Sequence, residues 1–182
     1  MLPPTRPPTG RPQTGEFADY ARTDIDRVEG DDAVEALAAQ ERTTLELLEP
    51  LKETQVSGLR YAPGKWTLKE VIGHLADDER IYCYRALCVA RGEPLPLPGF
   101  DENLYVAEAN FEARPLADLL KEYRSVREAT ITLLSGLPRE AWDRKGQVNG
   151  YTESVRGLAF HIAGHELRHV RALREKYLRL VT

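Results

Sequence analysis

Four stretches of this sequence repeat apolar residues at a spacing of three to four, which is the period of an amphipathic helix. They run from about Asp31 to Glu49, from Thr67 to Gly92, from Pro115 to Gly136 and from Ser154 to Tyr177. Strand signals are nearly absent, and an Asn-Gly pair within residues 147–151 predicts no more than a small hairpin. The pattern predicts an all-α fold, a four-helix bundle with long crossover connections.

The second of these stretches has the clearest start. Thr67 and Glu70 form a capping box, in which each side chain binds a backbone N–H of the other residue's turn, and Trp66 can pack onto Val71 one turn later. Pro115 suits the start of the third stretch because a first helical residue needs no N–H partner. These signals fix where two of the four helices begin.

The segments between the helices predict the domain organisation. A length of 182 residues suits one domain, with residues 18–182 as that domain and the proline-rich residues 1–17 as a disordered tail. The longest unusual connection spans residues 94–114. Long loops in compact domains are often binding elements, so we expect this one to line a pocket.

Composition excludes several classes of partner. The chain has 25 basic and 29 acidic residues, a net charge of -4, which disfavours nucleic-acid binding. It has no apolar run long enough to span a bilayer and no apolar secretory signal near its start. Cys83 and Cys88, five residues apart on one predicted helix, point away from each other and cannot form a disulfide. We therefore expect a cytoplasmic protein without a membrane or nucleic-acid partner.

The four histidines suggest a metal site. His161 and His165 are four residues apart and share one face of a helix, while His74 on the second helix can face the inside of the bundle. Three imidazoles on the inward faces of two helices could bind one divalent cation. A set of three protein ligands would leave a position for water or substrate, as in catalytic rather than structural sites.

Two other motifs overlap these histidines. His165-Glu166-Leu-Arg-His169 matches the zinc-protease pattern H-E-x-x-H, but only 13 residues follow it, too few for the usual third ligand. A ferritin-like di-metal site would need two Glu-x-x-His motifs, and the sequence has only the one formed by Glu166 and His169. Both interpretations are weaker than the three-histidine site.

The residues around His74 resemble a known family. Residues 66–80, WTLKEVIGHLADDER, are similar to the W-[ST]-x-x-E-x-x-x-H-L-x-D-x-E-R segment of the DinB/YfiT-like superfamily, which is distinct from the polymerase of similar name. His161 and His165 resemble the H-x-x-x-H of its last helix. The resemblance implies an up-down-down-up bundle, often a homodimer, and a single nickel or zinc ion bound by His74, His161 and His165.

Further pocket residues follow from reach along the helices. A metal-binding imidazole usually donates its second N–H to a carboxylate or carbonyl, and Asp77 and Asp78 are within helical reach of His74. Glu166 and His169 are the other candidates near the ligands. Arg85, Arg91 and Arg156 could bind an anionic substrate group, although exposed or salt-bridged arginine is the more common role.

The open three-ligand count and the resemblance leave three functions to consider. The first is a metal-dependent hydrolase of a small molecule, with water at the open metal position as the expected nucleophile. The second is metal-dependent transfer of a low-molecular-weight thiol such as bacillithiol or mycothiol. The third is a non-enzymatic, stress-related metal-binding bundle. The sequence does not name a substrate, and no catalytic side chain is assigned.

Overall fold

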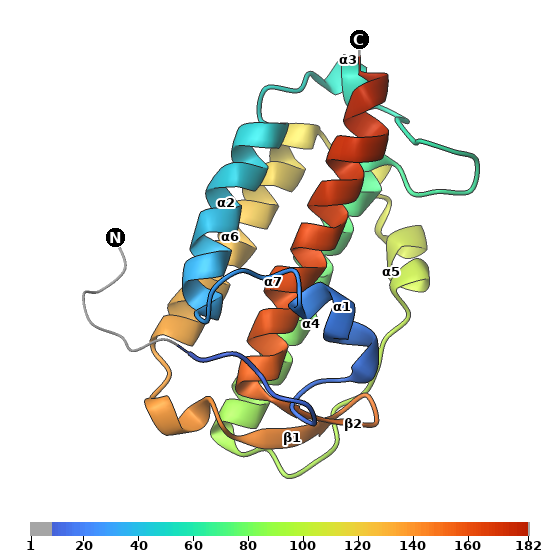
Figure 1. Ribbon diagram of the computed structural model, residues 1–182. Coiled ribbons are helices and arrows are strands. Elements are labelled where there is room, and N and C mark those ends of the chain that lie inside the picture. Colours follow the sequence, from blue (N-terminus) through green and yellow to red (C-terminus); the bar gives the residue numbers. More distant parts are fainter. Residues whose placement is uncertain (1–8, 182) are drawn as a thin grey trace.

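The computed structural model describes residues 9–181, which form a bundle of four long helices (Figure 1). The long helices are α2 (Ala33–Leu48), α4 (Leu68–Arg91), α6 (Leu116–Ser135) and α7 (Val155–Ala172), which continues as a π-helical turn over Leu173–Tyr177. The shorter elements are α1 (Arg22–Ile25), α3 (Glu53–Val56), α5 (Glu102–Ala109), 3₁₀ turns at Asp19–Ala21, Phe111–Ala113, Arg139–Ala141 and Leu178–Leu180, and the strands β1 (Lys145–Val148) and β2 (Tyr151–Ser154).

The long helices run up, down, down and up (Figure 1). Helix α2 packs against α6 and α7, and α4 packs against the same two helices. Because α4 and α6 point the same way, the chain must return along the whole bundle between them. That return carries α5, and the predicted all-α bundle with long crossovers is confirmed.

The helix boundaries follow the sequence signals. Asp32 accepts hydrogen bonds from the N–H groups of Val34 and Glu35 at the start of α2. Thr67 and Glu70 form the predicted capping box of α4. Ser154 accepts from the N–H of Gly157 at the start of α7. The predicted hairpin also forms, with β1 and β2 paired antiparallel around Asn149 and Gly150.

The N-terminal segment departs from the prediction of a disordered tail over residues 1–17. Residues 1–8 lie outside the described part, but residues 9–17 pack on the bundle. Arg156 donates to the carbonyl of Thr9 at 2.7 Å, and the N–H of Ser154 donates to the carbonyl of Glu16 at 2.8 Å. Arg11 donates to the carbonyl of Ile25 at 2.9 Å. Hydrogen bonds to backbone carbonyls, two of them donated by arginine side chains, therefore hold a proline-rich stretch that composition alone marks as unfolded.

Two glycines of α7 let this N-terminal segment approach closely. A Cβ at Gly157 would lie 2.0 Å from the carbonyl oxygen of Glu16, and one at Gly164 would lie 2.3 Å from that of Asp24. Any larger residue would push the segment away from the helix. As a result, α1 lies against the middle of α7 and covers one side of the bundle (Figure 1).

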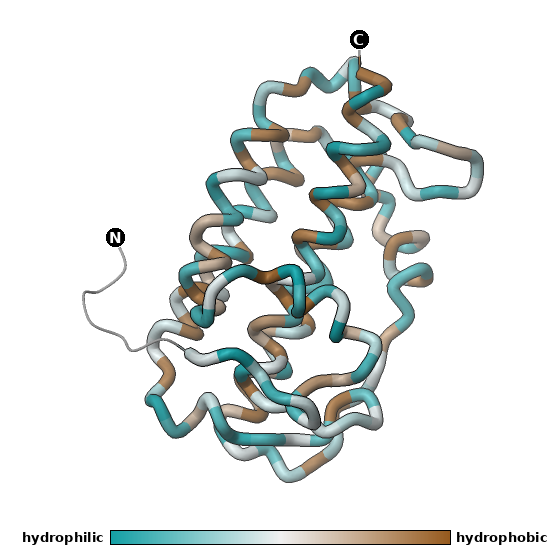
Figure 2. The backbone as a smooth tube through the Cα atoms, in the orientation of Figure 1, coloured by the Kyte–Doolittle hydropathy of each residue, from teal (hydrophilic) through white to brown (hydrophobic). Residues whose placement is uncertain are grey.

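The apolar core is divided into two clusters along the bundle axis. One contains, from the long helices, Ala33, Val34, Leu37, Tyr82, Ala86, Val89, Ala90, Val155, Leu158, Ala159, Phe160, Ile162 and Ala163, with Leu134 of α6. The other contains, from the long helices, Leu45, Leu48, Leu68, Val71, Ile72, Leu75, Leu116, Leu119, Leu120 and Tyr123. Hydrophilic positions separate the apolar ones along each long helix (Figure 2). Between the clusters lies a buried polar layer, which includes His165, Glu166, Asp78, Glu79 and Arg127.

No helix within residues 9–181 is long and apolar enough to cross a membrane.

Candidate metal site

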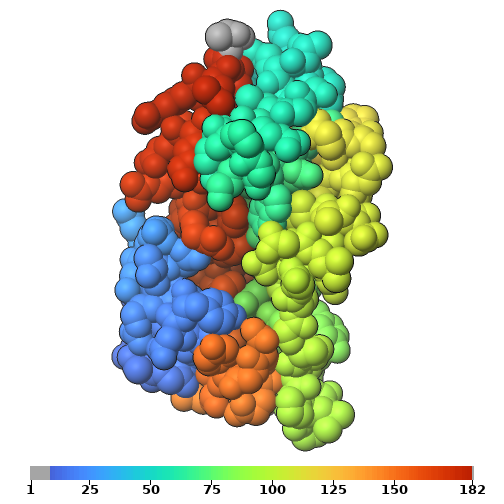
Figure 3. All heavy atoms as spheres, turned by 90° about the vertical axis from the view of Figure 1, so that its right-hand side faces the viewer, coloured from blue at the N-terminus to red at the C-terminus, as the bar shows by residue number. Residues whose placement is uncertain are grey.

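One side of the polar layer opens into a pocket of about 500 Å³. Figure 3 shows the surface hollowed between the blue N-terminal segment, the red α7 and the yellow-green segment around α5. As predicted, the connection over residues 94–114 contributes to the wall, through Phe100 and Glu102. The lining residues come from six parts of the chain: Tyr20, Thr23, Asp24, Arg27, Trp66, His74, Asp78, Tyr82, Arg85, Phe100, Glu102, Asn149, His161, His165, Arg168 and His169.

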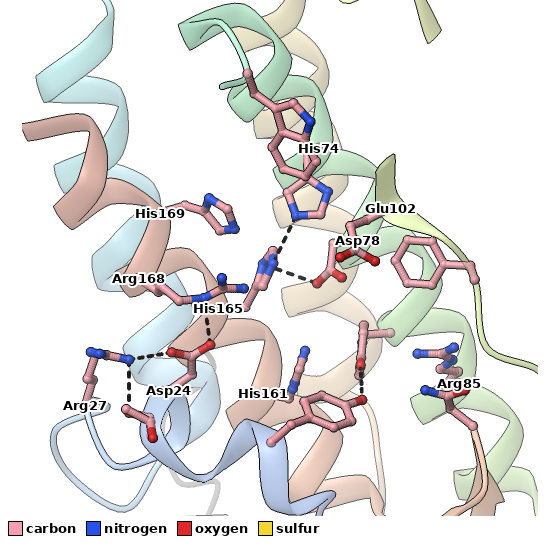
Figure 4. Close-up of a pocket in the computed structure, with 16 residues that line it drawn as sticks. Asp24, Arg27, His74, Asp78, Arg85, Glu102, His161, His165, Arg168 and His169 are labelled. Carbon is pink, nitrogen blue, oxygen red and sulfur yellow. Dashed lines mark hydrogen bonds and ion pairs between the residues drawn. The ribbon is translucent and has the colours of Figure 1, made fainter. Parts of the chain in front are cut away.

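Three histidines converge at the inner end of this pocket. His74 of α4 and His165 and His169 of α7 each offer a ring nitrogen, and these nitrogens all lie within 4.8 Å of one another. The Nε2 atoms of His74 and His165 are 3.1 Å apart (Figure 4). Nε2 of His169 is buried without a hydrogen-bond partner among the described residues. Two nitrogens bound at about 2 Å to one tetrahedral ion lie roughly 3.3 Å apart, which is close to the 3.1 Å between His74 and His165, so the group is a candidate site for a divalent cation.

His161 does not join this group. Its ring stacks on Tyr82 at a centroid distance of 3.9 Å and lies 5.9 Å from the ring of His165, one turn further along α7. The ligand set expected from the sequence, His74, His161 and His165, therefore differs by one residue from the set that the side chains bring together. His169, assigned in that expectation to the surroundings of the site, occupies the third position.

The antiparallel packing of α4 and α7 explains the difference. His74 lies in the first third of α4, and the start of α4 packs beside the end of α7. His161 is about 12 Å from His169 along the helix axis, too far down the bundle to face His74. The up-down-down-up topology, combined with the four-residue spacing of His161, His165 and His169, is the signal that indicates which two of these histidines lie nearest His74.

The two aspartates after His74 have different roles. Asp78 is buried, and its Oδ2 lies 3.3 Å from Nδ1 of His165 (Figure 4). It is the carboxylate that a metal-binding imidazole commonly has beside its second nitrogen, although it lies by His165 rather than His74. Asp77 pairs with Arg80 at 3.4 Å and does not line the pocket.

Burial holds all four imidazoles neutral. It lowers the pKa of His74 to about 4 and those of His161 and His169 to about 3, and Arg168 adds to each shift. The pKa of His165 is also lowered, by burial and then by the neighbouring histidines. Burial raises the pKa of Asp78 to about 8. Neutral imidazoles are the form that binds cations, so the histidines need no deprotonation at neutral pH.

Glu166, a predicted pocket residue, points away from the pocket. Its Oε1 accepts hydrogen bonds from Tyr123 at 2.5 Å and Thr44 at 2.6 Å, and its Oε2 pairs with Arg127. A rotation of about 100° per residue separates it from His165 and turns it toward α2 and α6. It lies within the buried polar layer on the far side of α7 and does not line the pocket.

Several lining residues were not anticipated from the sequence. The ring of Trp66 lies 4.7 Å from that of His74, in addition to its place at the start of α4. Asp24 pairs with Arg27 and with Arg168, at 2.8 Å for the latter, across the pocket rim (Figure 4). Asp24 and Tyr20 belong to the N-terminal segment, whose packing depends on Gly164 and Gly157 and carries no local motif.

The fold and the site together define a four-helix bundle with crossover connections and a buried three-histidine group at a pocket. The sequence profile described as the DinB superfamily matches residues 36–173, and the chain belongs to that family. Among solved structures it is similar to YfiT from Bacillus subtilis, a probable metal-dependent hydrolase with an unusual four-helix bundle topology. The two share 16% identity over 93% of each chain, with a TM-score of 0.69. Among curated proteins, none matches.

Proposed function

We propose that this protein is a metal-dependent hydrolase of a small molecule, with one divalent cation bound by His74, His165 and His169. The observation that carries the proposal is the convergence of three neutral imidazoles whose nitrogens lie within 4.8 Å of one another at the end of a pocket. Imidazole suits both nickel and zinc, and either is compatible with this donor set. The description of YfiT as a probable metal-dependent hydrolase supports the same activity.

The chain's own residues would prepare this site for chemistry. Asp78, 3.3 Å from Nδ1 of His165, fixes the orientation of that ring so that Nε2 faces His74. Trp66 packs on His74 and limits its movement. A divalent cation in such a site polarises a substrate carbonyl or phosphoryl group and lowers the pKa of water. Because three protein ligands leave part of the coordination shell open, substrate can reach it from the pocket.

The pocket volume sets the size of the substrate. About 500 Å³ is typical of sites for small organic molecules, and too small for a folded protein. Its walls combine aromatic rings, such as Tyr82 and Phe100, with charged groups. A substrate with both apolar and polar parts fits this lining best.

A second candidate is transfer of a low-molecular-weight thiol. A separate hollow of about 410 Å³ adjoins the pocket and shares Trp66, Arg168 and His169 with it. Lys65 and Lys176 line this hollow. Two cavities that meet at the histidine group could hold two substrates side by side, as a transferase requires. The homodimer and the cytoplasmic location remain predictions from the sequence.

An activity screen distinguishes the candidates. The zinc-loaded and nickel-loaded proteins are offered a panel of small esters, amides and phosphoesters, and separately a thiol with an electrophile. The hydrolase proposal predicts turnover of at least one member of the panel, lost with chelator and restored by the ion. Conjugation of the thiol without hydrolysis would replace it by the transferase, and inactivity in both arms would favour the non-enzymatic bundle.

A further inference from the structure

A buried arginine lies in the pocket beyond the histidine group. Arg85 of α4 is only 2% exposed. Its guanidinium donates to the carbonyl of Pro98 at 2.7 Å and lies 4.6 Å from the ring centre of Tyr82 and 5.7 Å from that of Phe100. An arginine has five N–H donors, so most of them find no acceptor in these contacts.

No carboxylate within residues 9–181 forms an ion pair with Arg85. The two other arginines of the pocket, Arg27 and Arg168, both pair with Asp24. Glu102 lies at the exposed rim. A buried charge without a counter-charge is costly, and a bound anion would supply the missing partner.

Two buried acids, Asp78 and Glu153, interact electrostatically with Arg85 but form no ion pair with it in the described chain. Glu153 of β2 is fully buried, and neither of its carboxylate oxygens has a hydrogen-bond partner in the described chain. Burial raises the pKa of Glu153 to about 7, and Arg85 offsets that shift only in part. Within residues 9–181, the guanidinium therefore has no hydrogen-bond acceptor besides the carbonyl of Pro98.

The position of Arg85 relative to the histidines is fixed by stacking. The guanidinium lies over Tyr82, Tyr82 stacks on His161 at 3.9 Å, and His161 lies 5.9 Å from His165. The pocket wall thus contains a row of side chains, here called the ladder, made of Arg85, Tyr82, His161 and His165. Arg85, His161 and His165 are labelled in Figure 4. A ligand that touches both Arg85 and the histidine group must extend along the ladder.

The other two arginines named from the sequence lack these properties. Arg156 pairs with Asp143 at 2.5 Å and with Glu16 at 3.5 Å, and does not line the pocket. Arg91 is exposed at the end of α4. Of the three, only Arg85 combines burial, an open donor set and a place in the pocket wall.

We propose that Arg85 binds an oxyanion of the substrate, a carboxylate or a phosphate, at the end of the pocket opposite the three-histidine group. The substrate is then an elongated small molecule with a negative charge at one end and the bond to be cleaved at the other. The position of the cleaved bond rests on the proposed function, whereas the anion site at Arg85 can be tested without any activity. Arg91→Met on the same helix is the matched control.

The test is an NMR titration of the ¹⁵N-labelled full-length protein, whose metal content is measured in parallel. Sodium acetate, sodium phosphate and the neutral acetamide are added at constant ionic strength. The arginine Nε–H signal that disappears in Arg85→Lys identifies Arg85. It should shift saturably with acetate or phosphate but not with acetamide, and the tighter of the two names the oxyanion.

The variants decide whether Arg85 is responsible. In Arg85→Met the dissociation constant, followed through the backbone signals of Phe100 and Asn149, should rise at least about tenfold, as expected for loss of a charge-assisted hydrogen bond. Arg85→Lys should bind with intermediate affinity, which keeps the test usable if Arg85→Met does not fold. Arg91→Met should bind as the unmodified protein does.

Three outcomes would overturn the proposal: no saturable shift, equal binding by Arg85→Met and Arg91→Met, or a loss of stability in Arg85→Met and Arg85→Lys with unchanged anion binding. The last result would mean that Arg85 only anchors the loop at Pro98. Anion binding in a protein that takes up no metal would support the anion site and refute the proposed hydrolase. Metal uptake without anion binding would do the reverse.

Discussion

Two buried polar clusters lie back to back in the middle of the bundle, and they differ in how completely their hydrogen bonds are satisfied. Adjacent residues supply both. On α4, Asp78 faces the histidines and Glu79 faces Arg127; on α7, His165 and Glu166 divide in the same way. Neighbouring residues on each of these two helices therefore face different clusters, one toward the histidines and one toward Arg127.

The cluster around Arg127 is closed. Its guanidinium binds Glu79 through Nε at 2.9 Å and Nη2 at 2.7 Å, donates to the carbonyl of Leu37 at 3.0 Å, and pairs with Glu166. Tyr123 and Thr44 complete the shell of Glu166. No pocket reaches Arg127 among those that line the described surface. Such a network ties four helices together and occupies four of the five N–H groups of the guanidinium.

The histidine side is open. Nε2 of His169 and Nδ1 of His161 are buried without hydrogen-bond partners in the part of the chain that is described. Buried polar atoms are normally paired, so unpaired ones in a pocket indicate a ligand that completes them. The comparison indicates that a buried polar cluster stabilises the fold where its hydrogen bonds are satisfied, and that it can bind a ligand where they are not.

Loss of Arg127 should have the largest effect. Arg127→Met leaves the buried carboxylates of Glu79 and Glu166 without their cation, so the free energy of unfolding should fall by about 3–5 kcal/mol. Urea unfolding of the metal-free protein measures it. Arg124 lies on the same helix as Arg127, and Arg124→Met, which removes an exposed pair with Glu49 beyond the end of α2, should cost less than about 1 kcal/mol. Equal effects of the two variants would contradict the closed-network account.

Glu153, whose buried carboxyl has no hydrogen-bond partner in the described chain, should make the free energy of unfolding depend on pH. Its pKa is raised from 4.5 to about 7, so its contribution to stability is full below pH 4.5 and is lost as the pH rises through 7. Glu153→Gln cannot ionise and should be more stable than the unmodified protein by up to roughly 3 kcal/mol at pH 9, with the difference shrinking toward pH 5. Urea unfolding at pH 5, 7 and 9 measures this, with exposed Glu140→Gln as control. A pH-independent difference would refute the assignment.

Gly164→Ala should loosen the N-terminal wall of the pocket. The added Cβ would lie 2.3 Å from the carbonyl oxygen of Asp24 and 2.8 Å from the N–H nitrogen of Ile25, so α1 must shift at a cost of about 1–3 kcal/mol. Hydrogen exchange of the residue 22–25 amides should accelerate. Gly136→Ala, whose Cβ would lie no closer than 3.5 Å to its neighbours, should change little. Unchanged exchange in Gly164→Ala would show that α1 does not depend on this contact.

The sequence predicts the bundle well because helical periodicity and caps are local. The capping box at Thr67 and the cap at Ser154 act within one turn, and both helices begin where these residues stand. The third histidine and the ordered residues 9–17 depend on contacts between distant segments. Whether His161 or His169 meets His74 is decided by the register of α4 against α7, and Thr9 is held by Arg156, 147 positions away.

Metal content of three single variants tests the central claim most directly. His74→Ala, His169→Ala and His161→Ala are purified in parallel, loaded with zinc or nickel, desalted and analysed for bound metal, with circular dichroism confirming that each is folded. The structure predicts that His74→Ala and His169→Ala lose most of the bound ion and that His161→Ala retains it. Retention by His169→Ala together with loss by His161→Ala would contradict the grouping of His74, His165 and His169.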